Sequence, residues 1–281
     1  MRTLRLAPVL LAALMLVPGC DNKKELTPEE IAAKLESDLE EAAARVRNNK
    51  LEDAEKIYLR VLETHPDHPK AVGGLGRVRL EEKKYEEAET LLAKAVAATP
   101  DDARLMYALG TSRMMQGKHA EAAEAYGQAF AADPENSEFG LSYGRQLKEA
   151  GSFAKAEEVL REVAELDPKA QFVFTELGDA LRGQSKNEEA LRTYMKAQNT
   201  YRSDKMAHAG AALTYELLGD NKHAADEWAA YITMDCCSDF SKTVAQKKIV
   251  TLEAGDGAAA EGGEAPGDEA APEGAEQDQA G

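Results

Sequence analysis

Residues 103–136 read ARLMYALGTSRMMQGKHAEAAEAYGQAFAADPEN, and the pattern of this segment returns every 34 residues along the chain. Its proline is the third of four that lie 34 residues apart, at Pro66, Pro100, Pro134 and Pro168. A period between 20 and 50 residues is typical of repeat architectures. The prolines define windows that continue past the last proline, at 35–68, 69–102, 103–136, 137–170, 171–204 and 205–238.

Three residue classes recur at fixed distances before the proline. Alanine stands twelve residues before it, as at Ala122, and a small residue stands twenty-four before it, as at Gly110. A large apolar residue stands eight before it, as at Tyr126. We expect the small residues to let two helix backbones approach closely, and the large residue to fill the space between successive units. Proline lacks an amide hydrogen and disfavours helix in the residue before it, so it marks the turn between units.

This pattern resembles the tetratricopeptide repeat family, in which each 34-residue unit is one helix–turn–helix. The resemblance covers residues 35–238 and implies an all-α, right-handed superhelical solenoid of about six units. Arg202 and Cys236 replace the proline in the last two windows, and the first window has Asp38 and Glu41 where large apolar residues are usual. Terminal units of such arrays are often atypical, because they act as caps.

The composition is acidic, with a formal net charge of −17. This charge argues against a nucleic-acid partner, because phosphate binding needs a positive surface. Residues 253–281 hold nine acids and no Lys or Arg, and consist mainly of Gly, Ala, Glu and Pro. Such a segment buries too little apolar surface to offset the entropy of ordering, and we predict that this tail is disordered.

Residues 1–20 have the features of an export signal. Arg2 and Arg5 precede an apolar run that is shorter than the roughly 20 residues of an ordinary membrane-spanning helix. The run ends in Val17-Pro18-Gly19-Cys20, which resembles a bacterial lipoprotein signal. The resemblance implies that Cys20 is acylated and anchors the mature chain to a membrane, facing the periplasm. An ordinary secretory signal and an uncleaved anchor are the alternatives.

A polar tether at 21–27 precedes the expected helical array at 28–252. Thr27-Pro28-Glu29-Glu30 predicts its first helix, with Thr27 as the N-cap and Glu30 completing a capping box. The last part, 239–252, is amphipathic, and we expect it to form a capping helix over the open apolar face of the sixth unit.

The sequence gives little support for a catalytic or metal site. The segment His65-Pro66-Asp67-His68-Pro69 could supply metal ligands, but a turn with two exposed histidines is the simpler interpretation. Cys236 and Cys237 could form a vicinal disulfide, pair with another chain or remain thiols, and neither belongs to a recognisable nucleophile motif. We expect no enzymatic activity, no cofactor, no metal and no small-molecule substrate.

In tetratricopeptide arrays the first helices line the inner surface, where partners usually bind. The corresponding positions here hold recurring cations, interleaved with aromatic residues and methionine. The residues expected to form a protein-binding groove are Arg77, Arg104, Tyr107, Met114, Arg145, Lys148, Phe172 and Arg182. Guanidinium groups pair with carboxylates and Met gives adaptable apolar contact, so the expected ligand is a protein segment of acidic and apolar character. The alternative is that the arginines form salt bridges with acids of neighbouring helices.

Six repeats behind a lipoprotein signal resemble, in architecture, the pilotins that help type IV pilus secretins reach and assemble in the outer membrane. The resemblance implies a lipid-anchored scaffold or adaptor in the bacterial cell envelope, with a protein partner. The alternative function is a scaffold or regulator in cell-wall synthesis or outer-membrane protein assembly. Asp21, directly after Cys20, favours this alternative where Asp at that position retains lipoproteins in the inner membrane. The sequence leaves the choice of membrane open.

Overall fold

The computed structural model describes residues 27–235 and 238–261, and every element within them is helical. Six antiparallel hairpins follow one another, and a π-helical turn, η1 (Ser241–Ala245), then leads into a final helix. The α-helices are α1 (Pro28–Arg47), α2 (Leu51–Thr64), α3 (Pro69–Glu81), α4 (Tyr85–Ala98), α5 (Ala103–Met114), α6 (His119–Ala132), α7 (Ser137–Glu149), α8 (Phe153–Leu166), α9 (Val173–Gly183), α10 (Asn187–Thr200), α11 (Lys205–Leu218), α12 (Asn221–Met234) and α13 (Gln246–Glu261). The all-α solenoid predicted from the repeat is confirmed.

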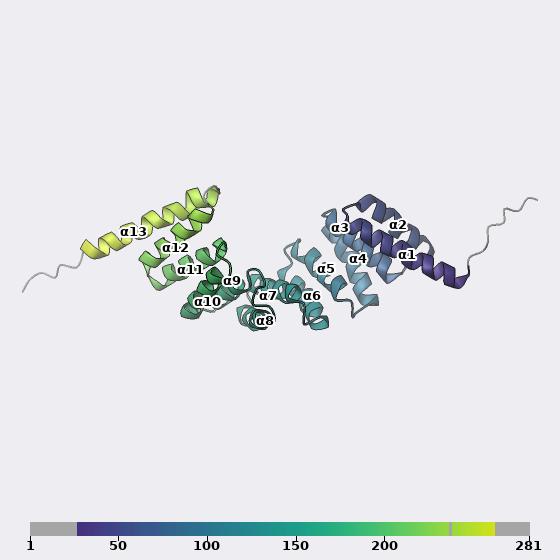
Figure 1. Ribbon diagram of the computed structural model, residues 1–281, viewed down its shortest axis with the longest axis horizontal. Coiled ribbons are helices and arrows are strands. Elements are labelled where there is room, and N and C mark those ends of the chain that lie inside the picture. Colours follow the sequence, from purple (N-terminus) through teal and green to yellow (C-terminus); the bar gives the residue numbers. More distant parts are fainter. Residues whose placement is uncertain (1–26, 236–237, 262–281) are drawn as a thin grey trace, which may run out of the picture.

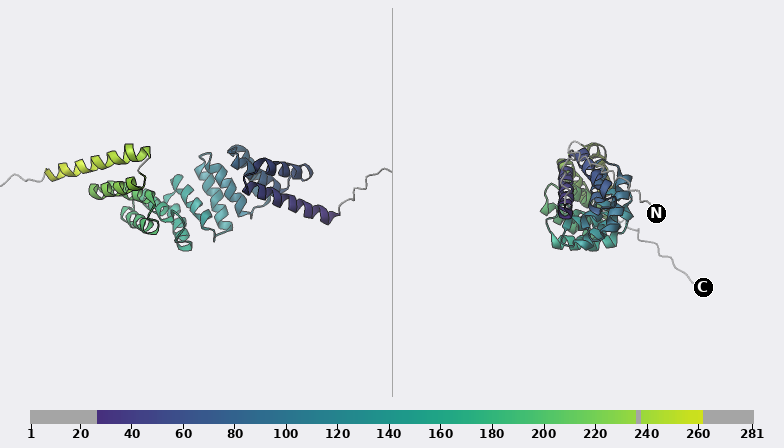
Figure 2. Two further views of the ribbon diagram at one scale, coloured as in Figure 1. Left: turned by 45° about the horizontal axis from the view of Figure 1, so that its top comes forward. Right: turned by 90° about the vertical axis from the view of Figure 1, so that its right-hand side faces the viewer.

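The hairpins stack into an elongated, curved array with α1 at one end and α13 at the other (Figures 1 and 2). Each helix packs on its neighbours in sequence. The odd-numbered helices also approach one another, as α1 and α3 or α9 and α11 do, whereas no comparable approach joins successive even-numbered helices in the described residues. The odd-numbered helices therefore lie on the inside of the curve. None of the helices described is long and apolar enough to cross a membrane.

Helix α1 begins where the sequence predicts. The Glu30 amide donates to the Thr27 hydroxyl at 3.2 Å, and the Thr27 amide donates to the Glu30 carboxylate at 2.8 Å, which completes the capping box. On the apolar face of α1, Leu39 and Ala42 are buried, but Ile31 is 47% exposed. Ile31 lies in the first turn of α1, which extends beyond the part of the helix packed against α2.

The turn inside each hairpin holds one residue in the left-handed backbone conformation. These six residues lie 34 apart and have φ between 56° and 77°; they are Asn49, Lys83, Gly117, Gly151, Ser185 and Gly219. Glycine adopts this conformation without the steric cost that a Cβ adds, which explains its use at three of the six turns. The backbone period thus matches the period of the sequence.

The small residue of each first helix makes room for a large side chain. A Cβ added to Gly110 would lie 2.8 Å from the Tyr126 ring, and one added to Gly144 would lie 2.6 Å from Leu160 Cγ. The space is therefore filled by a side chain of the same hairpin, whereas the sequence suggested close contact between two backbones. The large residue can also reach the next hairpin, since a Cβ on Gly210 would lie 2.4 Å from the ring of Tyr194.

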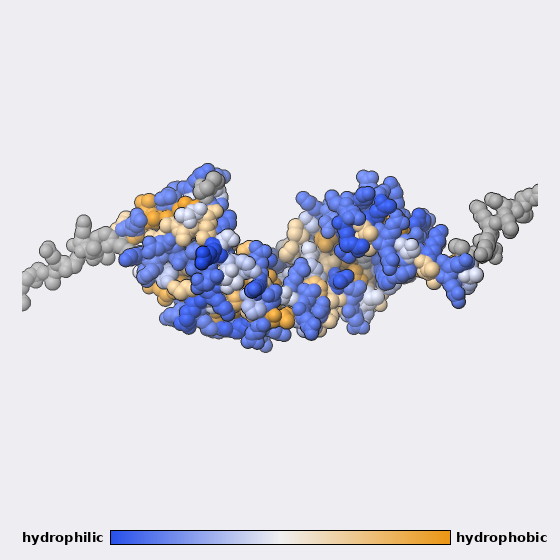
Figure 3. Space-filling model, viewed as in Figure 1, coloured by the Kyte–Doolittle hydropathy of each residue, from blue (hydrophilic) through white to orange (hydrophobic). Residues whose placement is uncertain are grey.

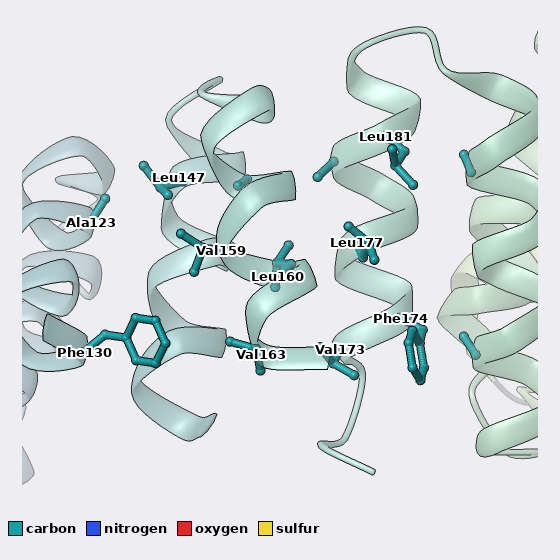
Figure 4. Close-up of a cluster of buried hydrophobic side chains, with 14 of the residues drawn as sticks. Ala123, Phe130, Leu147, Val159, Leu160, Val163, Val173, Phe174, Leu177 and Leu181 are labelled. Atoms are coloured by element: carbon teal, nitrogen blue, oxygen red, sulfur yellow. The ribbon is translucent and has the colours of Figure 1, made fainter. Parts of the chain in front are cut away.

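The hydrophobic core is divided into clusters along the array, as expected where each unit contacts mainly its neighbours. Figure 4 shows the middle cluster, in which Phe130 of α6, Val163 of α8 and Val173 of α9 lie along the boundaries between hairpins. Buried apolar contacts of this kind hold successive hairpins together, because an isolated hairpin would leave these side chains in water.

Helix α13 covers the last hairpin, where Ile249 and Leu252 pack on the cluster around Trp228. The helix runs to Glu261 and so includes nine residues, 253–261, that we assigned to the disordered tail. Ala254 and Ala258–Ala260 have high helix propensity, and a helix that has already formed extends at little cost. The rest of the tail, the signal, the tether, Cys20 and the pair Cys236 and Cys237 lie outside the described residues.

Candidate functional site: the inner face

The predicted groove cations of α7 and α9 form ion pairs with acids of α9. The Arg145 Nε donates to Glu176 Oε1 at 2.8 Å. The Lys148 Nζ lies 2.7 Å from Glu176 Oε2 and 3.0 Å from Asp179 Oδ2. Arg182, on α9 itself, places Nη2 3.5 Å from Asp179 Oδ1. For these three cations the salt-bridge alternative describes the structure.

Lys148 is a partly buried cation, with a side chain that is 16% exposed. Burial alone would lower its pKa, but the carboxylates of Asp179 and Glu176 raise the pKa above its usual value. Asp179 is further held by Tyr194, whose hydroxyl donates to Oδ1 at 2.7 Å. The charges of this cluster therefore satisfy one another and have little left for a ligand.

Tyr107 and Met114 lie on the inner face as half-buried side chains. The ring of Tyr107 stacks on Phe139 of α7 with centroids 4.9 Å apart, and its hydroxyl donates to Glu138 Oε1 at 3.1 Å. The Met114 sulfur accepts from the Tyr126 hydroxyl at 3.8 Å. Both residues thus contribute to hairpin packing as well as to the surface.

Arg77 of α3 and Arg104 of α5 differ from the other cations. Both side chains are exposed, and neither forms an ion pair with any residue that the structure describes. Their guanidinium groups keep all their donors available to a carboxylate. Within the predicted groove, these two arginines are the ones free to bind an acidic ligand.

Phe172 lies in an irregular turn and not in the first helical turn, where the repeat frame would place it. Helices α5, α7 and α11 are capped by the side chains of Asp102, Asn136 and Asp204, each of which accepts backbone amide hydrogen bonds. The equivalent residue before α9 is Ala170, which has no acceptor. Helix α9 accordingly starts at Val173, and Phe172 has a left-handed φ of 68°.

This irregular turn borders a hollow of about 480 Å³ on the inner face. The residues that line it come from the start of α7 and from the turn before α9; they are Ser137, Glu138, Leu141, Arg145, Asp167, Lys169, Ala170, Gln171 and Phe172. The structure thus brings two predicted groove residues, Arg145 and Phe172, to one site. Neither Arg77 of α3 nor Arg104 of α5 lines this hollow.

Glu176 was not among the residues expected on this face, although it neutralises two of the predicted cations. A spacing of 31 residues would have indicated it, because successive inner helices place residues at this separation side by side. The pairs Tyr107–Glu138, Arg145–Glu176 and Lys148–Asp179 all have this spacing. The 31-residue spacing can be recognised in the sequence only when the acidic residues of the inner face are considered together with the cations.

His65 and His68 lie in the turn between α2 and α3, with ring centroids 6.3 Å apart. His65 is exposed, and His68 is partly buried at the start of α3. Within the residues described, no group of three or more His, Cys, Asp or Glu side chains could hold a metal ion.

Comparison with known families gives two matches, both described as tetratricopeptide repeats, at residues 39–103 and 113–173. A search of curated proteins gives no match. Among solved structures, the chain is similar to YrrB, described as a TPR protein with an unusual peptide-binding site, at 25% identity and a TM-score of 0.57, over 60% of this chain and 88% of YrrB.

Two further solved structures are similar to longer parts of the chain. PilF of Pseudomonas aeruginosa is 17% identical with a TM-score of 0.59, over 80% of this chain and 98% of PilF. The C-terminal part of a TPR repeat-containing protein from Cytophaga hutchinsonii is 16% identical with a TM-score of 0.60, over 81% of this chain and 100% of that one. At these identities the likeness concerns the fold alone. The family matches, the structural neighbours and the stacked hairpins together support a tetratricopeptide repeat protein.

Proposed function

We propose that this protein is a lipid-anchored, non-catalytic adaptor that holds a segment of an envelope protein on its inner face. The observation that carries this proposal is that the exposed guanidinium groups of Arg77 and Arg104, on the inside of an acidic solenoid, pair with no carboxylate of the described residues. Arg104 lies one helical turn from the half-buried ring of Tyr107 on α5, and together these side chains provide charge and apolar contact for an acidic segment. The peptide-binding site named for YrrB supports a peptide ligand here.

The anchor in this proposal is the acyl-modified Cys20, and the finer function is assistance in assembling an envelope complex such as a type IV pilus secretin. The supporting sequence features are the lipoprotein-like signal at 1–20 and the six repeats behind it. Replacing Cys20 by Ala should release the protein from the membrane fraction and abolish incorporation of a labelled fatty acid. Incorporation into the Cys20→Ala protein would contradict the anchor.

The groove is tested by crosslinking in intact cells followed by mass spectrometry, with Arg77→Glu and Arg104→Glu combined in one protein. We expect this variant to lose its principal crosslinked partner while its helical content stays unchanged. Arg192→Glu is the matched control, because Arg192 is exposed on α10 and forms no ion pair within the described residues. Equal crosslinking by the double variant and the control would contradict the groove.

The identity of the partner decides between the two envelope functions. Recovery of a secretin, together with failed pilus assembly in a deletion strain, supports the pilotin-like function. The alternative, a scaffold or regulator in cell-wall synthesis or outer-membrane protein assembly, is favoured by Asp21 where the retention rule applies. Migration with the inner membrane on a density gradient would support this alternative and count against a pilotin.

A further inference from the structure

Helix α13 acts as the first helix of a seventh, incomplete unit. It packs on α12 as each odd-numbered helix packs on the helix before it, with Ser241 and Ala245 buried at the start of the segment. Lys248 of α13 is paired across the inner face with Glu216 of α11, at 2.6 Å. The separation of 32 residues is one more than in the Arg145–Glu176 pair, and the π-helical turn η1 accounts for one extra residue. The inner face therefore continues onto α13.

Between α11 and α13 lies a hollow of about 440 Å³, which we name the terminal hollow. The residues that line it are Glu216, Thr243, Val244, Lys247, Lys248, Thr251 and Leu252. Of its apolar side chains, Val244 is 38% exposed and Leu252 is partly exposed. Figure 3 shows hydrophobic residues gathered at this end of the molecule on a mostly hydrophilic surface. The hollow thus offers apolar contact that no described residue takes up.

One of the two cations that line the terminal hollow has no carboxylate partner in the described residues. The Glu216 carboxylate is neutralised by Lys248 and also accepts from the Trp228 indole nitrogen at 2.6 Å. Lys247 is exposed and forms no ion pair with any residue in the described ranges. An exposed ammonium that no described carboxylate pairs with, beside the exposed Val244 side chain, is complementary to a ligand that is acidic and apolar at once.

We propose that the terminal hollow is a second docking site, and that its occupant is an acidic segment of another protein with large aliphatic side chains. Its carboxylate would pair with Lys247, and its aliphatic side chains would cover Val244 and the exposed part of Leu252. Residues 262–281 of this chain carry six acids but no apolar residue larger than Ala and Pro, so they match the charge and not the apolar surface. The inference takes from the proposed function only that the protein binds polypeptide segments.

The test uses Trp228, the one tryptophan of the chain, as a reporter, because its hydrogen-bond partner Glu216 lines the hollow. The full chain is titrated with a synthetic helical peptide of Leu and Glu, with its Lys-for-Glu counterpart and with its Ser-for-Leu counterpart. We expect a saturable change in Trp228 fluorescence with the Leu/Glu peptide, and at least tenfold weaker binding of the other two. Equal binding of the Lys-for-Glu peptide would overturn the proposal.

Variants locate the binding. Lys247→Glu and Val244→Asp should each weaken binding of the Leu/Glu peptide at least tenfold. Leu59→Asp should leave it unchanged, because Leu59 is 43% exposed on the outer helix α2. Far-UV circular dichroism confirms that each variant is folded. Unchanged binding by Lys247→Glu would overturn the site.

A synthetic peptide of residues 262–281 tests whether the chain's own tail occupies the terminal hollow. If it produces the same fluorescence change at the same concentration as the Leu/Glu peptide, the chain's own tail is the occupant and the proposal is wrong. Because the titration reports only on the end of the array that holds Trp228, it succeeds or fails independently of crosslinking at Arg77 and Arg104.

Discussion

Replacing Glu89 by Gln should weaken the link between the second and third hairpins. The Glu89 carboxylate on α4 accepts from Arg113 Nε at 3.0 Å, Gln116 Nε2 at 2.9 Å and Lys118 Nζ at 2.7 Å, all from the third hairpin. The hydrogen bond from Lys118, together with those from Gln116 and Arg113, lowers the pKa of Glu89 to about 2 against the opposing effect of burial. One carboxylate therefore anchors three side chains of the next unit.

The size of the effect follows from this pKa. A shift from the usual 4.5 to about 2 corresponds to an upper limit of roughly 3 kcal/mol for the ionised carboxylate. Lys118 is 42% exposed, and screening by water reduces the contribution to about 1–2 kcal/mol. We expect Glu89→Gln to lower the free energy of unfolding by this amount at pH 7, measured by urea denaturation followed by circular dichroism.

The pH dependence has a definite sign. The folded pKa of Glu89 lies below the unfolded value, so the stabilisation is present above about pH 4.5 and is lost as the pH falls toward 2. The difference between the wild-type protein and Glu89→Gln should shrink by more than half between pH 6 and pH 3. Glu124→Gln is the control, because Glu124 is exposed and forms no ion pair in the described residues. A difference that is constant with pH, or no larger than that of the control, would refute the reasoning.

Three further substitutions test the repeat geometry, each by denaturation at pH 7. Gly117→Ala should cost about 1–2 kcal/mol through backbone strain alone, because φ is 73° and no atom lies within 4 Å of the added Cβ; Lys83→Gly at the equivalent turn should instead stabilise by about 0.5 kcal/mol. Gly110→Ala should cost about 1–3 kcal/mol by overpacking, because its Cβ would lie 2.8 Å from the Tyr126 ring, and a neutral result would mean that the ring moves freely. Tyr194→Phe should cost about 1 kcal/mol through the lost hydrogen bond to Asp179, while the helical content stays constant.

The hairpins could be predicted from the sequence because their determinants are local and periodic. A proline, a small residue and a large apolar residue at fixed spacing determine where each helix begins and what it packs against, as Gly110 and Tyr126 do within a single hairpin. The capping box at Thr27 is equally local, since its two hydrogen bonds join residues three apart. A feature that is determined within one hairpin recurs in each hairpin, so the sequence shows it as a period.

The electrostatics of the inner face could be predicted only in part, because they depend on pairs between units. Arg145 and Arg77 hold the same position of the repeat, two units apart, yet Arg145 pairs with Glu176 of the following unit, and Arg77 has no such partner in the described residues. Whether a cation is free thus depends on one residue 31 positions away. A site defined by repeat position alone therefore contains both bound and available charges.

The backbone of the turn before α9 could not be predicted from the repeat pattern either. Its cause can be tested by a substitution. Ala170 lacks the acceptor that Asp102, Asn136 and Asp204 provide at equivalent positions, so α9 starts late and Phe172 takes a left-handed φ of 68°. Ala170→Asp should restore the cap, raise the free energy of unfolding by about 1 kcal/mol and move Phe172 into helical geometry. Backbone chemical shifts of residues 170–173 measure this directly.

The same substitution separates two causes of the irregular turn. If the shifts of Phe172 stay those of a left-handed residue in Ala170→Asp, the missing cap is not the cause, and the packing of Phe172 beside Leu141 in the hollow holds the turn open instead. A residue held in a strained conformation by its surroundings is typical of a binding site, because the strain persists only where neighbouring contacts enforce it. A helical Phe172 would mean that a single alanine, by failing to cap α9, created this hollow on an otherwise regular inner face.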